Sequence, residues 1–232
     1  MYARQVDRLT LTFGVSGLLV RNSLVMYDHE TGSLWSHLTG QALAGPLAGG
    51  QLNLVASTQA SWANWRRAHR STFVLAFDPS LASDPNSTYY RSPRLGVYHD
   101  QADIVIDPRL KPKEKVIGLR LDGHVKAYSL TTLAKDKVVN DIVADVPVVI
   151  VFDGVTESGA VFRRDPAGEA LIFRAGPGAL ELLDDGSEST WDGLTGKATS
   201  GPLKGAVLEQ IPITYGFWFA WSDFYPETDL FA

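Results

Sequence analysis

Short apolar segments separated by turn residues dominate this chain, and they predict strands rather than long helices. The clearest pattern is a hairpin, in which Val116–Leu121 and His124–Leu130 flank Asp122-Gly123, a pair that suits a type I′ turn. Pro147–Phe152 is continuously apolar and is expected to be a strand buried on both faces. The pattern therefore predicts a mainly β fold with short helices, of the α+β class.

Weaker signals predict the remaining elements. Ser61 is expected to cap a short helix over Trp62–His69, and Thr131–Lys137 is a second candidate helix. Ala160–Arg164 and Ala170–Arg174 are predicted to pair with each other around the turn between them.

The chain contains an internal repeat. Leu24–His69 aligns with Leu180–Tyr225 without a gap, at an offset of 156 residues. Sixteen of the 46 aligned positions hold the same residue, where composition alone would give about three. Ahead of this match, Leu11–Phe13 aligns with Leu171–Phe173. We call the two aligned parts the first copy and the second copy.

Tryptophans and turn residues make up much of the identity. The repeated tryptophans are Trp35, Trp62, Trp65, Trp191, Trp218 and Trp221, and the repeated turns are Gly45-Pro46 and Gly201-Pro202. A Gly-Pro pair marks a corner, because a central strand could not contain it. The helical tryptophans, three residues apart, share one helix face. They could form a sugar-stacking surface, but core anchors explain two equal sets better, so we expect all six to be mostly buried.

The repeat also suggests a domain division. Residues 1–78 are expected to form a first, partial β module, and 108–232 a complete second module. Residues 79–107, rich in Ser, Pro, Asp and Asn, are expected to connect them as a loop. Since Val116–Ala160 has no counterpart in the first copy, the first module is predicted to lack its N-terminal strands.

Composition removes several classes of function. The chain has no cysteine, which excludes disulfides, thiolate metal sites and a cysteine nucleophile. Its formal net charge of -5 argues against a nucleic-acid-binding face. No apolar run is long enough to span a membrane, and the first residues do not resemble a signal peptide. We therefore expect a soluble protein of unknown compartment.

Few side chains have a pattern that points to chemistry. Asp28, His29 and His37 could gather around a metal, but their spacing fits no known ligand pattern and the second copy lacks both histidines. Asp184, Asp185 and Glu188 could act as paired carboxylates, although turn-forming acids explain them better. No catalytic residue, bound cofactor or metal is predicted.

Several short motifs resemble a known family, the one named only as domain of unknown function 3179. They are Phe13-Gly-Val-Ser-Gly17, Met26-Tyr-Asp28, Ser33-Leu-Trp35, Gly45-Pro-Leu47, Lys126-Ala-Tyr128, Val139-Asn-Asp141 and Trp218-x-x-Trp221. The resemblance covers nearly the whole chain, with the motifs in the family's order. It implies membership but no activity.

This sequence departs from the family pattern where reactive groups would be expected. The resemblance implies a His-Glu pair and a Cys-x-x-Cys strand in relatives, which would suit a soft metal or redox chemistry. Here Lys135-Asp-Lys137 and Phe152-Asp153 stand near those positions in the second copy. That site is not present in this chain.

These observations favour a non-catalytic β scaffold or binding protein that acts in a complex. A module without its first strands has an open β edge, so we expect pairing with another chain or a second copy through the first 25 residues or so. The alternative is a part of a metal-binding or redox protein whose Cys/His site lies outside this chain.

Overall fold

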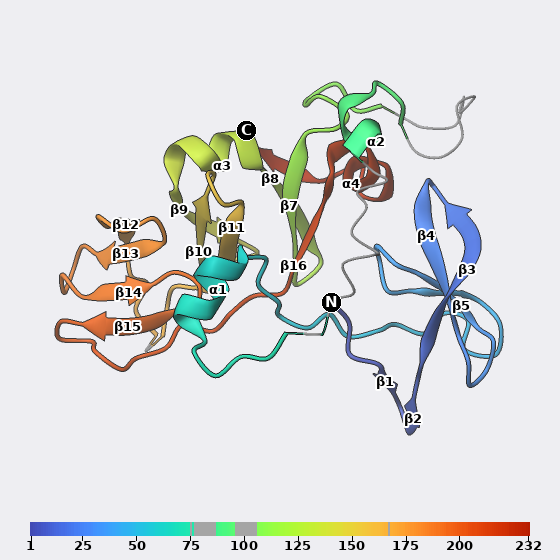
Figure 1. The fold of residues 1–232 in the computed structure, drawn as a ribbon, viewed down its shortest axis with the longest axis horizontal. Coiled ribbons are helices and arrows are strands. Elements are labelled where there is room, and N and C mark those ends of the chain that lie inside the picture. The colour runs from blue at the N-terminus through green and yellow to red at the C-terminus, as the bar shows by residue number, and fades with distance from the viewer. Residues whose placement is uncertain (75, 77–86, 96–105, 167) are drawn as a thin grey trace.

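The computed structural model describes residues 1–74, 76, 87–95, 106–166 and 168–232. It is mainly β with short helices, as predicted. The two repeated four-stranded sheets lie at opposite ends of the molecule, β3–β6 in blue and β12–β15 in orange (Figure 1). Within the described ranges, no helix is long and apolar enough to cross a membrane.

The first copy is built on an antiparallel sheet followed by a helix. A small hairpin comes first, formed by β1 (Gln5–Val6) and β2 (Leu9–Thr10). The sheet has the order β3-β4-β5-β6, with β3 Phe13–Val20, β4 Ser23–Asp28, β5 Leu34–Ser36 and β6 Ala42–Ala44. Helix α1 is Trp62–Ala68, and the side chain of Ser61 caps it as predicted by accepting from Asn64 N.

The second copy repeats this arrangement and adds two strands. Its sheet has the order β12-β13-β14-β15, with β12 Phe173–Ala175, β13 Glu181–Asp184, β14 Thr190–Asp192 and β15 Lys197–Ser200. The chain continues through β16 Ile213–Phe217, α4 Trp218–Phe224 and β17 Asp229–Phe231.

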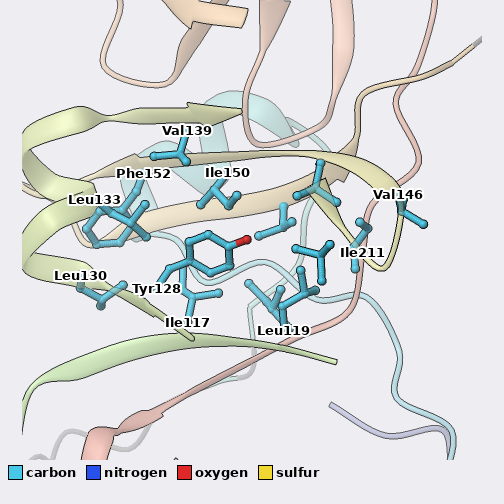
Figure 2. Packing of buried hydrophobic residues seen from close by; sticks show 14 residues of the cluster. Ile117, Leu119, Tyr128, Leu130, Leu133, Val139, Val146, Ile150, Phe152 and Ile211 are labelled. Carbon is cyan, nitrogen blue, oxygen red and sulfur yellow. The ribbon is translucent and has the colours of Figure 1, made fainter. Parts of the chain in front are cut away.

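The strands that precede the second copy form two further sheets. The elements are β7 Lys115–Leu121, β8 His124–Ser129, α3 Leu130–Asp136, β9 Val138–Val143, β10 Val146–Asp153 and β11 Ser158–Arg163. One sheet has the order β16-β7-β8-β17 and the other β11-β10-β9. Their facing side chains form the largest apolar cluster, with Tyr128 at its centre and Leu133 of α3 along one side (Figure 2).

The predicted β7–β8 hairpin is confirmed, and so is the continuous apolar strand. Asp122 and Gly123 both have positive φ angles, 46° and 83°, as a type I′ turn requires. Strand β10 lies between β9 and β11, and its residues 148–152 are fully buried or nearly so. Because β10 is covered on both edges and both faces, the side chains of residues 148–152 do not reach water, and a polar side chain there would be buried. This explains the unbroken apolar run.

One predicted strand pair is wrong. Ala160–Arg164 and Ala170–Arg174 do not pair as strands, because β11 pairs with β10 and β12 pairs with β13. A single backbone hydrogen bond, from Leu171 N to Arg164 O, joins the two segments. The buried Arg164 side chain also donates to the backbone of both β10 and Leu171. These bonds, rather than a β ladder, connect the two segments.

The predicted loop over residues 79–107 contains one short helix, α2 (Ser87–Arg91). The rest of that segment is described only at residues 92–95 and 106–107, so the loop prediction lies mostly outside the described residues.

A longer β3–β4 hairpin distinguishes the first copy from the second. The offset between the copies is 160 residues up to Phe13 and 156 from Leu24 onward, so the first copy has four extra residues between these points. The extra length lies where the β3–β4 register shifts, between Val15 and Leu19. We call residues 14–23 the arm.

Arg21 at the tip of the arm contacts α4 of the second copy. It donates to the backbone of Asp223, lies 3.5 Å from the Asp223 carboxylate, and stands over the ring of Phe224. The arm therefore holds the two copies together at α4.

Candidate functional site

Asp28 is a structural residue of the first sheet. Its buried carboxylate accepts a hydrogen bond of 2.8 Å from Trp35 Nε1 and two more from Thr31. Burial alone would raise the pKa of Asp28, but the hydrogen bonds from Trp35 and Thr31 outweigh it and hold the pKa below its usual value. The carboxylate is therefore ionised and already occupied by protein donors.

The predicted metal candidates do not come together. His29 is exposed and packs its ring against Tyr27, and His37 is exposed as well. In the residues for which positions are given, no group of three or more His, Asp or Glu side chains is arranged to hold a metal ion.

The acidic turn of the second copy is structural too. Buried Asp184 accepts from the backbone of Gly186 and from Ser187. Asp185 and Glu188 each lie 2.8 Å from the guanidinium of Arg174. These carboxylates neutralise one arginine rather than forming an acid/base pair.

The repeated Gly-Pro corner packs against the repeated serine. A Cβ on Gly45 would lie 2.7 Å from Ser33 Cα, and one on Gly201 would lie equally close to Ser189 Cα. Both glycines also have positive φ angles, 95° and 84°. The serine hydroxyls then accept from backbone N–H groups just past Pro46 and Pro202, those of Leu47 and Leu203, at 3.1 and 3.0 Å. The corner therefore serves the fold in both copies.

Four of the six repeated tryptophans are buried. Trp35 and Trp191 lie in the two sheets, each edge-on to a phenylalanine from the first strand of its sheet. Trp218 and Trp221 belong to α4, and their side chains pack against β7 and β8. Trp221 occupies the space above Gly118 of β7, where an added Cβ would come within 2.2 Å of the indole.

The expectation of burial is wrong for Trp62, which is 49% exposed, and holds only partly for Trp65. Trp65 keeps the local contact of its counterpart, since its Nε1 donates to Thr72 at 2.8 Å as Trp221 Nε1 donates to Thr228 at 3.1 Å. Strands β7 and β8 pack against the tryptophans of α4. No described strand packs against α1 in the equivalent position, so Trp62 remains exposed.

Helix α1 instead attaches to the strands before the second copy by a different face. Ser61 N donates to Ser158 Oγ, and Asn64 Nδ2 donates to Thr156 Oγ1, both at 2.9 Å. Ala60 and Ala68 pack on the apolar cluster beneath β14 and β10. In Figure 1, α1 accordingly lies beside β10 and β11, far from β3–β6.

The correspondence between the copies extends back to the first residues. Met1–Arg4 takes the place that Val161–Arg164, the end of β11 and the residue after it, has in the second copy. Three backbone hydrogen bonds of the first copy each have an equivalent in the second, and all six are between 2.7 and 2.9 Å long. Val55 N to Met1 O matches Ile211 N to Val161 O, Ala3 N to Asn53 O matches Arg163 N to Glu209 O, and Leu11 N to Arg4 O matches Leu171 N to Arg164 O. Sequence reasoning missed this match, although the Leu11–Phe13 offset of 160, carried back ten residues to Met1, would have found it.

Among the residues that the structure describes, the outer side of Met1–Arg4 has no neighbour equivalent to β10, which pairs with β11. In the second copy, Phe162 pairs with Val149 of β10, and Arg164 N donates to Pro147 O. In the first copy, Ala3 N–H points inward, so the alternation of a strand directs the N–H groups of Tyr2 and Arg4 outward. Across the described ranges, no backbone partner meets them. We call Met1–Arg4 the open edge.

A polar cluster joins two of the family-like motifs. The buried Tyr128 hydroxyl donates to Asp141 Oδ2, and Lys126 Nζ lies at the same oxygen, both at 2.7 Å. Burial acts to raise the pKa of Asp141, but the bonds from Lys126 and Tyr128 outweigh it and lower that pKa. Burial and the Asp141 carboxylate raise the pKa of Tyr128. The cluster thus consists of an ionised acid and a protonated phenol that tie β8 to β9.

A cavity of about 580 Å³ opens between the two copies. Its lining includes Gln59, Tyr90, Lys113, Lys115 and Phe217. Lys113 donates to the backbone of Tyr89 in α2, and Lys115 pairs with Glu157 at 2.6 Å, so both charges already have partners. The cavity has the size of a small-ligand site, but its described lining provides no convergent set of unpaired polar groups.

The comparison with protein families decides membership. A family model described as "Protein of unknown function (DUF3179)" matches residues 1–228. The chain belongs to this family. As a DUF3179 protein it acquires no activity from the name, and neither curated proteins nor solved structures provide a match. The arrangement of its own residues is therefore the basis for any functional conclusion.

Proposed function

We propose that this DUF3179 protein is a non-catalytic β scaffold that acts in a complex and accepts a strand from another chain at the open edge. The observation that supports this most directly is the pair of outward N–H groups on Tyr2 and Arg4, whose counterparts, Phe162 and Arg164, meet β10. An unpaired edge is a template for strand addition.

Exposed apolar side chains elsewhere in the first 25 residues also favour an interface. Leu9 of β2, and Val15 and Leu18 of β3, are large apolar side chains that are 40%, 71% and 52% exposed. Apolar side chains left exposed on one unit provide the area that a strand pair by itself lacks. In a purified sample the available partner is a second copy of the chain, so we expect a symmetric dimer.

Light scattering on the purified protein tests the proposal. The expected mass is twice the 25.3 kDa of one chain. Arg4→Pro removes an outward N–H and no described hydrogen bond within the chain, so this variant should be a folded monomer. Ala3→Pro is the matched control, because it breaks the inward bond to Asn53 and should instead lower the stability. A monomeric unmodified protein, or a dimer that Arg4→Pro leaves intact, would contradict the proposal.

A further inference from the structure

The most informative contrast in the molecule is between the contact faces of α1 and α4. Helix α4 buries Trp218, Trp221 and Ser222 against β7 and β8. The same positions on α1 are Trp62, Trp65 and Arg66, and none of them is buried. Helix α1 buries Asn64 instead, on the side that meets Ser158 and Thr156. We call Trp62, Trp65, Arg66 and His69 the tryptophan face of α1.

Trp65 and His69 of the tryptophan face are already ordered by contacts within the chain. Trp65 Nε1 is fixed by Thr72, and the ring of His69 stacks on Trp65 with centroids 4.0 Å apart. The helix itself is anchored from its other side. A half-exposed indole beside a fixed one, on an anchored helix, is typical of an interaction surface, because its area is available and little ordering is needed on binding.

The second copy shows what shape fits such a face. There the cover is an antiparallel hairpin, β7–β8, with small or β-branched residues toward the helix: Val116, Gly118, Val125 and Ala127. Glycine at 118 is required, because any Cβ there would collide with the indole of Trp221. A partner of the tryptophan face therefore needs a glycine opposite Trp65.

The positive charge of α1 further restricts which partner can bind the tryptophan face. Arg66 replaces the buried Ser222, and His69 replaces Tyr225, over which Arg120 of β7 lies at 5.9 Å. Arg66 and Arg70 are exposed, and neither forms an ion pair or hydrogen bond in the described part of the chain. A hairpin seated on this face needs a carboxylate where β7 has Arg120, since a buried arginine without a counter-charge is costly.

We infer that the tryptophan face of α1 binds a glycine-bearing, acidic β-hairpin of a partner polypeptide, in the way that α4 receives β7–β8. The inference rests on the proposed role as a binding scaffold, but it uses a surface separate from the open edge. The hairpin of a second copy is not the occupant, because its matching face is already covered by α4.

A designed peptide tests this on the full-length protein. The probe is residues 115–130 of this chain, closed across its ends, with Arg120→Glu to supply the carboxylate. Ile117→Thr, Leu119→Thr and Tyr128→Thr keep its other face soluble, and circular dichroism establishes that the peptide is a hairpin before use. Binding is followed by the fluorescence anisotropy of a labelled peptide.

We expect saturable binding that weakens about tenfold or more with Trp62→Ala in the protein or Gly118→Val in the peptide. A peptide with Arg120 retained should also bind more weakly, and Arg66→Glu should reverse that preference. Tyr90→Ala, which removes an aromatic residue 53% exposed on α2, is the matched control and should bind normally.

Three outcomes would overturn the inference. One is the absence of binding by the folded hairpin at about 1 mM, the weak limit for a specific contact. Another is binding that Trp62→Ala leaves unchanged. If Trp62→Ala instead abolishes self-association of the protein, a second copy covers the face and the assigned partner is wrong. Arg4→Pro should leave peptide binding intact, so failure of the open-edge proposal is distinguished from failure here.

Discussion

Trp62 and Trp218 occupy the same position of two repeated helices, yet Trp62 is 49% exposed and Trp218 is fully buried. Local sequence does not cause the difference, because both tryptophans begin a helix and stand three residues before another tryptophan. Its cause is the presence of β7 and β8 under one helix and the absence of described counterparts under the other.

This contrast predicts unequal costs of truncation. Trp221→Ala should lower the free energy of unfolding by about 3–5 kcal/mol, because it empties a fully buried site over Gly118. Trp62→Ala should cost less than about 1 kcal/mol, because much of its side chain is already in water. Urea denaturation of both variants measures the difference. Equal costs would mean that α1 is covered in solution.

Asp28 should stabilise the fold in a pH-dependent way. Its pKa in the folded protein lies below the usual value, so its contribution is fully present above the unfolded-state pKa of about 4. The contribution is lost as the pH falls through the lower, folded-state pKa. At pH 7, Asp28→Asn should cost about 1–3 kcal/mol, because the bonds from Trp35 and Thr31 lose their charged acceptor.

The measurement is thermal or urea unfolding of Asp28→Asn and the unmodified protein from pH 7 downward. The difference between their stabilities should begin to shrink near pH 4 and disappear as the pH falls through the lower, folded-state pKa of Asp28. Asp185→Asn, at an exposed ion pair with Arg174, is the control and should cost less than about 1 kcal/mol. A gap that persists unchanged into acid would show that Asp28 acts through shape rather than charge.

Gly45 and Gly49 allow a clash to be separated from backbone strain. Both have positive φ angles, 95° and 86°, but only Gly45 has an atom within 4 Å of an added Cβ. Gly49→Ala should therefore cost about 1–2 kcal/mol, the usual penalty of a left-handed alanine. Gly45→Ala should cost clearly more, since Ser33 must move. Chemical denaturation of the two variants decides, and similar costs would mean that the Gly-Pro corner is not tightly packed.

Local patterns predicted the local structure well. Asp122-Gly123 specifies its turn by backbone preference alone, and Ser61 caps α1 by a bond three residues away. The mainly β class followed from the same kind of signal. These features depend on neighbours in sequence, so a single sequence contains them.

Features that depend on distant neighbours were not predictable in the same way. Ala160–Arg164 pairs with β10 rather than with Ala170–Arg174, the strand expected next to it. Sequence neighbours alone do not show which of two possible partners a strand will pair with. The exposure of Trp62 depended on which face of α1 meets Ser158, about a hundred residues away. The open edge lay within reach of the repeat alignment, but only the hydrogen bonds of Met1 and Ala3 make its direction visible.

The arm also gives the contact between the two copies a direction. Arg21 of the first copy holds α4 of the second, a head-to-tail contact, and such contacts propagate without limit when every unit has both halves. Here the two copies cannot exchange their roles in the contact. The second copy has no four-residue extension with which to reach onward, and α1 has Arg67 where α4 has Asp223, so it would repel an incoming arginine. One short insertion and one reversed charge therefore make this head-to-tail contact specific to the first copy's arm and the second copy's helix.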